Sequence, residues 1–190
     1  MHPRNPYKIR TDFRSLAASY PSFAALLDRN TKLDFSNRQN TIILTKCLLN
    51  RDYGLNIEFP TNSLSPSLTL KMNYLLWIED LLLSNEHIAS VTKEPKMIVG
   101  LDIGTGGAIL FPVLAVKHFG WSMLCTENNK DDCDMALHNI RSNGLENQIK
   151  VFHNPDKDTM FSAVNLMENI TFTMTNPPFY DTEDYGKHLT

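Results

Sequence analysis

The chain has 190 residues, of which 42% are hydrophobic and 21% charged, and its formal net charge is −3. This length suits one domain with a sizeable core and an N-terminal extension. The mild negative charge excludes nucleic-acid binding through the overall field, so any such binding must use a local basic patch.

Neither a metal site nor a membrane span is expected. The three cysteines, Cys47, Cys125 and Cys133, form no CxxC pair, and the histidines are scattered without ligand spacing. An odd cysteine count without a signal peptide favours reduced thiols in an intracellular compartment. The apolar segment 75–83 is interrupted by Glu79 and Asp80, so we predict that it does not cross a membrane.

The first 14 residues form a predicted basic arm, with Arg4, Lys8, Arg10 and Arg14 against a single acid. Aromatic residues are interleaved with these charges, a pattern that suits phosphate contacts and base stacking. Composition alone favours the alternative, a solvated and disordered tail.

Helical periodicity predicts three helices before the sheet. The first covers 13–29 with a break at Pro21, the second covers 37–50 with Asn37 as its N-cap and Gly54 as its stop, and the third covers about 72–84. A connector rich in Ser, Thr, Asn and Pro is expected over 60–69. Trp77 and Trp121 lie in apolar patterns and are expected in the core.

From residue 97 the pattern changes to strands alternating with helices. The apolar strand 97–103 enters a glycine-rich turn at 104–107, and a helix follows from Ala108. Strands are expected at 121–126, 149–152 and 170–175, with helices at 130–143 and 159–168. The acid after the second strand, Glu127, lies about 20 residues beyond the glycines, where nucleotide-type folds hold ribose hydroxyls. A bare GxGG pattern is weak, and a tight turn between packed elements is the alternative.

The most informative stretch follows the last strand: Asn176, Pro177, Pro178 and Phe179. Two prolines end the strand and stiffen the loop, because neither has an N–H to donate. The Asn176 amide oxygen and the Pro177 carbonyl could accept the N–H bonds of a planar amine and direct its lone pair toward a methyl donor. Phe179 could stack on the ring of a flipped base. The alternative is a proline-stiffened turn with a packed phenylalanine.

These features together resemble class I S-adenosylmethionine-dependent methyltransferases. The opening residues 1–8, the segments 70–74 and 77–81, and the motif 102–106 are similar to the methyltransferase-like protein 16 family. The resemblance implies an α/β Rossmann-like fold and an RNA adenine N6-methyltransferase that uses S-adenosylmethionine and acts on U6 small nuclear RNA and hairpin RNA. It implies a nuclear location, with the cytoplasm as a second one.

The resemblance also implies roles for individual residues. Asn176, Pro177, Pro178 and Phe179 would form the catalytic loop. The expected cofactor-binding residues are Lys71, Gly104, Ala108, Glu127, Thr159 and Asn176, and the expected RNA-binding residues are Arg4, Lys8 and Arg10. Lys71 stands where the family usually has arginine. Lysine keeps the positive charge but cannot make the bidentate contact that arginine makes. Ala108 stands for a usual serine, whereas Pro6 and Ser36 stand where relatives have basic residues.

Only four of the seven strands of such a sheet can be placed before residue 176. We therefore expect a basic arm and helical RNA-binding extension at 1–90 and a shortened methyltransferase core at 91–190, with an exposed sheet edge. We expect the full protein to methylate RNA and this piece alone to be weak or inactive. The alternatives are a methyltransferase for ribosomal RNA adenine or for protein glutamine, and a non-catalytic RNA-binding fragment.

Overall fold

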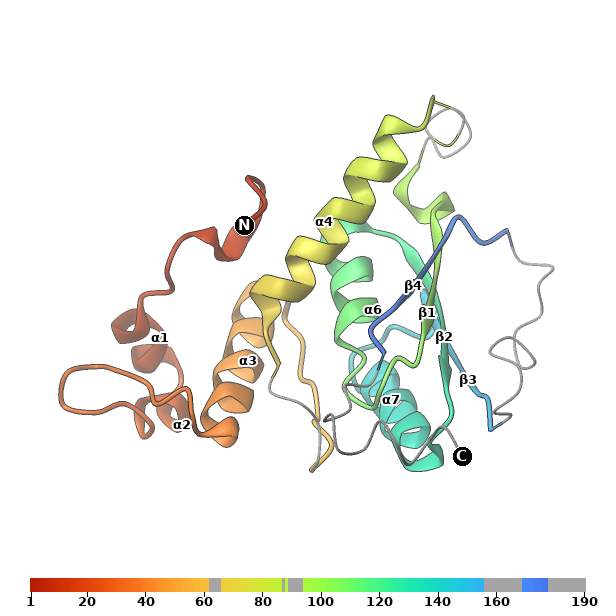
Figure 1. The fold of residues 1–190 in the computed structure, drawn as a ribbon. Coiled ribbons are helices and arrows are strands. Elements are labelled where there is room, and N and C mark those ends of the chain that lie inside the picture. The colour runs from red at the N-terminus through yellow and green to blue at the C-terminus, as the bar shows by residue number, and fades with distance from the viewer. Residues whose placement is uncertain (62–65, 87, 89–93, 156–168, 178–190) are drawn as a thin grey trace, which may run out of the picture.

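The structure, a computed structural model, describes residues 1–61, 66–86, 88, 94–155 and 169–177. Small helices near the N-terminus lie at one end of the molecule and the sheet lies at the other, with a long helix between them (Figure 1). Thr159, Pro178, Phe179 and the helix expected at 159–168 lie outside the described residues. None of the described helices combines the length and the apolar character that a membrane span requires.

The four expected strands form one parallel sheet. They are β1 (Val99–Ile103), β2 (Ser122–Glu127), β3 (Ile149–His153) and β4 (Phe172–Thr175), in the order β3-β2-β1-β4. The predicted α/β class is thus confirmed. Because β2 and β4 flank β1 on opposite sides, the chain reverses its direction of winding between β1 and β4. Open parallel sheets bind ligands at the carboxyl ends of strands at such a switch point.

Three helices pack beside the sheet. α6 (Leu110–Leu114) follows β1 and continues into a π-helical turn, η3 (Ala115–Phe119), and α7 (Lys130–Ser142) follows β2. α4 (Leu68–Ser84) begins about one turn before the expected residue 72, so the connector predicted at 60–69 is shorter. The Ser67 side chain caps this helix by accepting a hydrogen bond from the Leu70 N–H at 3.4 Å.

The N-terminal layer contains a short 3-10 helix, η1 (Pro6–Lys8), and three α-helices, α1 (Phe13–Ser19), α2 (Pro21–Ala24) and α3 (Arg38–Tyr53). The break predicted at Pro21 is confirmed. Helix α2 ends before the expected residue 29, because the chain turns back through an antiparallel bridge between Leu27 and Leu33. Asn37 caps α3 as predicted, and Gly54 ends it with a left-handed φ of +66°.

The basic arm is docked on α4, so the disordered tail favoured by composition is wrong for these residues. The buried Asn5 side chain donates to the Thr69 carbonyl at 2.9 Å and to the Asn73 amide oxygen at 2.7 Å. Arg4 forms ion pairs with Glu79 and Asp80 farther along the helix. These contacts fix the arm along one face of α4.

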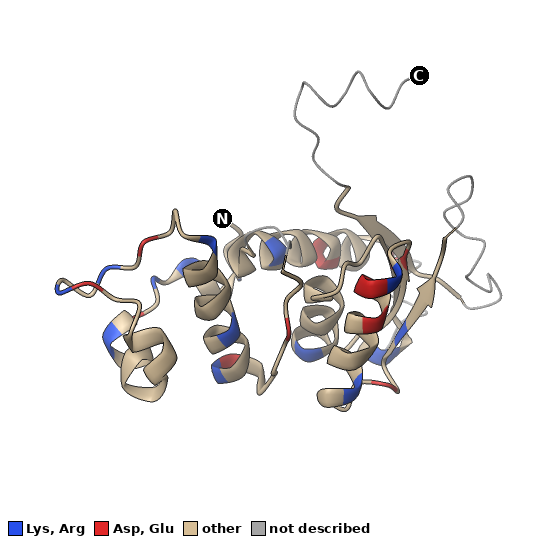
Figure 2. Cartoon of the chain, turned by 90° about the horizontal axis from the view of Figure 1, so that it is seen from below, with Lys and Arg blue, Asp and Glu red and all other residues tan. Residues whose placement is uncertain are grey.

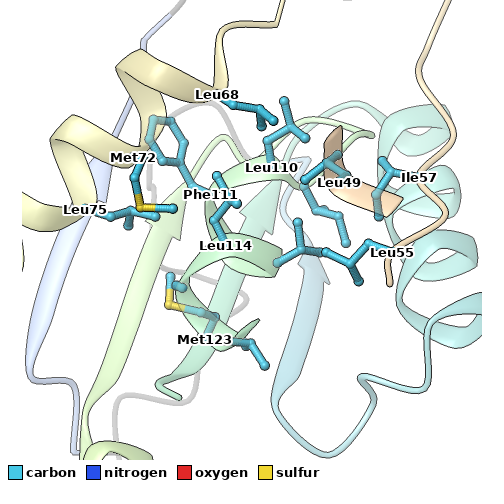
Figure 3. Packing of buried hydrophobic residues seen from close by; sticks show 14 of the residues in the cluster. Leu49, Leu55, Ile57, Leu68, Met72, Leu75, Leu110, Phe111, Leu114 and Met123 are labelled. Carbon is cyan, nitrogen blue, oxygen red and sulfur yellow. The ribbon is translucent and has the colours of Figure 1, made fainter. Parts of the chain in front are cut away.

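One hydrophobic cluster joins the N-terminal layer to the sheet. Figure 3 shows Leu68, Met72 and Leu75 of α4 against side chains of α6, with the next layer formed by Leu49 of α3 and the segment that carries Ile57. The cluster includes residues on both sides of position 90. The boundary expected there stays a prediction.

The two tryptophans differ in their surroundings. Trp121 is buried as predicted, whereas the prediction for Trp77 is wrong, since 55% of it is exposed. Trp77 lies on the outer side of α4 and stacks on Tyr74, with ring centroids 6.2 Å apart. Helical spacing alone does not separate the inner from the outer apolar face of such a helix.

The fully buried Asn139 of α7 links three segments of the chain. Its amide oxygen accepts from the Glu58 N–H at 2.8 Å, and its amide nitrogen donates to the carbonyls of Glu58 and Gly107 at 2.9 Å each. This one side chain holds the segment at 55–59 against the glycine turn.

We expect Asn139→Ala to lower the free energy of unfolding by about 3 kcal/mol, because buried backbone groups lose their partners. Asn143 is the matched control: it makes a similar pair of bonds with the Asn56 backbone in a more solvent-exposed position. Asn143→Ala should cost about 1 kcal/mol, since water replaces the lost partner. Urea denaturation measures both values, and equal losses would contradict the role assigned to Asn139.

Candidate active site

A cavity of about 800 Å³ lies at the carboxyl ends of β1 and β4. Its walls are the first half of α4, the turn after β1, the start of α7 and the loop around Pro60. The candidate site residues in its lining are Lys71, Asp102, Gly104, Ala108 and Asn176. Four of the predicted cofactor residues, Lys71, Gly104, Ala108 and Asn176, are therefore brought together.

The glycine turn is held by the end of β2. The N–H groups of Gly104 and Thr105 both donate to the Thr126 carbonyl, at 2.9 and 3.0 Å. Gly104 and Gly106 have φ values of +71° and +69°, in the left-handed region that favours glycine. Because a Cβ at either position would meet nothing within 4 Å, the backbone conformation is what requires glycine there.

The next residues are restricted by space and by strain. A Cβ on Gly107 would lie 2.8 Å from the Pro60 ring and 2.9 Å from an Asp132 carboxylate oxygen, so no larger residue fits without rearrangement. Ile109 caps α6 with a φ of +43°, which for a β-branched residue costs roughly 1–2 kcal/mol. Strain of this kind is found at ligand sites, where the surrounding structure maintains it.

Glu127, the predicted ribose ligand, is buried at the end of β2. One carboxylate oxygen accepts from the Gly106 N–H at 2.8 Å and the other from the Asn129 N–H at 2.9 Å. In this arrangement the Glu127 carboxylate connects the glycine turn to the start of α7. Each oxygen retains a second lone pair, and its contact with a ribose stays a prediction.

The start of α7 supplies cavity residues that sequence reasoning missed. Asn129, Asp131 and Asp132 line the cavity, and Asn129 also caps α7 by accepting from the N–H groups of both aspartates. The residue pattern of this segment predicts only the start of a helix. Its position directly after the second strand, at the ligand-binding edge of a parallel sheet, was the signal available.

Two residues of opposite charge, Lys71 and Asp102, line the cavity. The half-buried ammonium of Lys71 is 4.3 Å from the Phe111 ring centroid, and burial lowers its pKa, while the attraction of Asp102 raises it. Asp102 is 2% exposed, and burial raises its pKa to about 6, although the neighbouring Thr105 hydroxyl and then Lys71 act to lower it. The Thr105 hydroxyl lies beside the Asp102 carboxyl, but within the described part of the chain Asp102 Oδ2 makes no hydrogen bond of regular geometry. Buried polar atoms of this kind suit a polar ligand group.

Asn176 enters the same cavity from β4. Strands β1 and β4 pair in parallel with Ile103 beside Thr175, and the Thr175 hydroxyl donates to the Ile103 carbonyl at 3.0 Å. Asn176 and Gly104 are the residues that follow this pair. The Asn176 side chain is exposed and lines the cavity, so it is accessible to a substrate.

The predicted RNA-binding residues do not share one environment. Arg4 is engaged by Glu79 and Asp80, whereas Lys8 and Arg10 are exposed. Arg10 lines a second cavity of about 380 Å³ between the arm and α3. Figure 2 shows basic residues spread over the arm and the N-terminal helices, with acidic residues at the start of α7. No cluster of three or more metal-ligating side chains occurs in the described ranges.

The family described as RNA methyltransferase matches residues 1–190. The U6 small nuclear RNA (adenine-(43)-N(6))-methyltransferase of Drosophila pseudoobscura pseudoobscura is 33% identical over 190 residues, which cover 96% of this chain and 60% of the relative. The Schizosaccharomyces pombe protein of the same name is 38% identical over 156 residues, which cover 82% of this chain and 40% of the relative. The chain thus spans less than two thirds of these relatives.

Solved structures resemble the whole chain. The N-terminal domain of human METTL16 in complex with SAH has a TM-score of 0.82 at 32% identity, covering 100% of this chain and 76% of that one. The human catalytic domain in complex with MAT2A 3'UTR hairpin 1 has a TM-score of 0.81 at 32% identity, covering 100% and 63%. The fold is therefore the Rossmann-like fold of these methyltransferase domains.

The pKa of Asp102 predicts how stability depends on pH. The carboxyl ionises near 3.8 when unfolded but only at about 6 when folded, so between these values the folded state binds the proton more tightly. The stability contribution of this group therefore falls as the pH rises from 4 to 6, and the loss above pH 6 is about 3 kcal/mol.

We expect Asp102→Asn, which cannot ionise, to be more stable than the wild type at pH 8 by up to about 3 kcal/mol, with a gain that shrinks toward zero near pH 4. Urea unfolding across this range measures the difference. The exposed Glu146 provides the control Glu146→Gln, which should show no such pH-dependent gain. A constant difference between Asp102→Asn and the wild type would contradict the raised pKa.

Proposed function

Because this chain belongs to the RNA methyltransferase family, we propose that it acts as, or as part of, an RNA adenine N6-methyltransferase. The proposed reaction transfers a methyl group from S-adenosylmethionine to adenosine in U6 small nuclear RNA and hairpin RNA. The names of the fly and yeast relatives support the U6 substrate, and the human structure with a MAT2A hairpin supports a structured RNA.

The observation that carries this proposal is the position of Asn176 at the end of β4, in the cavity that the glycine turn lines. The exocyclic amine of adenine is a weak nucleophile, since its lone pair is delocalised into the ring. The Asn176 amide oxygen and the Pro177 carbonyl would accept its two N–H bonds and turn that lone pair into the cavity. This is a positioning and electrostatic effect and needs no general base. Stacking of the base on Phe179 stays part of the proposal.

The cavity residues fit the proposed cofactor. S-adenosylmethionine supplies an electrophilic methyl group on a sulfonium when it is bound. The Lys71 ammonium would pair with the carboxylate at the amino-acid end, and the unpartnered oxygen of Asp102 lies in the same part of the cavity for a cationic or hydrogen-bonding group. Gly104 would let the backbone approach the ligand, Ala108 would line the site, and Glu127 would bind ribose hydroxyls. Thr159 is proposed to contact the adenine moiety.

Residues 1–90 are proposed as the RNA-binding part, beside a methyltransferase core at 91–190. Lys8 and Arg10 are exposed and suited to phosphate contacts. Arg4 is proposed as a further RNA-binding residue, and its ion pairs with Glu79 and Asp80 also connect the arm to α4. Action on U6 small nuclear RNA would place the protein in the nucleus, and we propose the cytoplasm as a second location.

We expect Asn176→Ala to lower the rate of methyl transfer by roughly a hundredfold or more, since one of the two groups that orient the amine is lost. The measurement incubates the protein with an adenine-containing hairpin and S-adenosylmethionine, digests the RNA and quantifies N6-methyladenosine by mass spectrometry. The 190-residue chain and a form extended to the length of the relatives should be assayed together, with product expected from the longer form.

Three outcomes would contradict the proposal. If Asn176→Ala gave as much N6-methyladenosine as the wild type, the catalytic role of the loop at 176–179 would be wrong. Methylation of ribosomal RNA or of protein glutamine in place of the hairpin would identify another substrate. Failure to bind S-adenosylmethionine in calorimetry would favour a non-catalytic RNA-binding protein.

We expect Lys71→Met to weaken S-adenosylmethionine binding roughly tenfold or more, because a charge-assisted hydrogen bond in a partly buried site is lost. Lys71→Arg is the matched variant and should bind at least as tightly as the wild type, since it restores a bidentate fork. Calorimetric titration measures both. Equal binding by Lys71→Met and the wild type would show that Lys71 does not hold the cofactor.

A further inference from the structure

The second cavity, of about 380 Å³, has aromatic rings and a basic side chain in its lining. Phe35 is 60% exposed, and its ring centroid lies 6.3 Å from that of Phe13. Phe13 in turn packs edge-on against the buried Phe23 at 5.3 Å. An exposed ring beside a partly buried ring that is itself packed on the core is a suitable stacking surface.

The turn that carries Phe35 is tied down by its neighbours. The Asp34 carboxylate accepts from the Ser36 N–H at 2.9 Å, and the Asn40 side chain of α3 donates to the Asp34 carbonyl at 3.0 Å. Tyr7 and Arg10 of the docked arm also line this cavity. The turn that carries Phe35 is therefore positioned before a ligand arrives, which reduces the entropy lost on binding.

The polar groups of this cavity suit a nucleotide. Arg10 is exposed and forms no ion pair within the described part of the chain. The hydroxyls of Thr11 and Thr69 also belong to the lining. A guanidinium beside an aromatic face matches a phosphate attached to a base, and the excess of basic residues in the arm matches the charge of RNA.

Pro66 and Ser67 line both cavities, so the same short segment separates the second cavity from the candidate active site. We propose that the second cavity holds one unpaired nucleotide of the RNA, its base stacked on Phe35 and its phosphate paired with Arg10. This inference rests on the proposed RNA substrate. The subsite would hold a neighbouring nucleotide while the target adenosine enters the active site.

The test measures binding of a fluorescently labelled hairpin RNA with an unpaired loop to the 190-residue chain by anisotropy, at several salt concentrations. Phe35→Ala should weaken binding about tenfold, whereas Phe35→Trp should retain it. Ile9→Ala is the matched control, because Ile9 is 81% exposed and does not line the cavity. Arg10→Ala should lower the salt slope by about one, whereas Arg29→Ala, an equal charge change on an exposed loop, should not.

Loop nucleotides are then replaced one at a time by abasic residues. At one position, removal of the base should weaken wild-type binding about tenfold and leave Phe35→Ala unaffected, because both changes remove the same contact. The inference is overturned if the wild type does not bind the RNA, if Phe35→Ala equals Ile9→Ala, or if the two losses add at every position.

Methylation assays on the same RNAs separate this inference from the proposed function. If the protein methylates the RNA and Phe35→Ala binds the RNA as tightly as the wild type, the proposed subsite is wrong and the proposed reaction is unaffected. If RNA binding depends on Phe35 but neither the short nor the extended form gives methylated product, the proposed reaction is wrong and the subsite is still supported.

Discussion

Three backbone N–H groups of the turn after β1 are held by the end of β2, and the candidate active site depends on these hydrogen bonds. The Thr126 carbonyl accepts from Gly104 and Thr105, and the Glu127 carboxylate accepts from Gly106. Because the end of β2 fixes the turn, the turn keeps its conformation without a bound ligand, and the side of the turn that lines the cavity stays accessible. The left-handed glycines follow from the same geometry, because the chain must reverse while it stays close to β2.

The second constraint is the parallel pairing of β1 with β4, which places residues far apart in sequence at one edge of the sheet. The register sets Asn176 beside the glycine turn, but it supplies only one side of the cavity. The opposite wall comes from α4, which is held against α6 by Met72, Leu75 and their apolar neighbours (Figure 3). The N-terminal extension is therefore part of the site, since Lys71 reaches the cavity only because this packing fixes its helix.

Local signals in the sequence predicted the features that depend on neighbours in the chain. The strands, the glycine turn and the caps at Asn37 and Gly54 belong to this group. The remaining features depend on partners far away in sequence. The ion pairs of Arg4 lie more than 70 residues along the chain, and the exposure of Trp77 depends on which face of α4 meets α6. No local pattern carries that information.

Helix α4 connects the two parts of the proposed function. Asn73, Glu79 and Asp80 anchor the arm along it, and Lys71, near its start, lines the cavity. The residues that anchor the arm lie on the same 17-residue helix as Lys71, so the distance between arm and cavity is set by a rigid element and not by a flexible linker. An RNA held by the arm would thus meet the active site at a defined position. Methyl transfer requires such placement, because an amine whose lone pair is only weakly available reacts when it is held in line with the methyl donor.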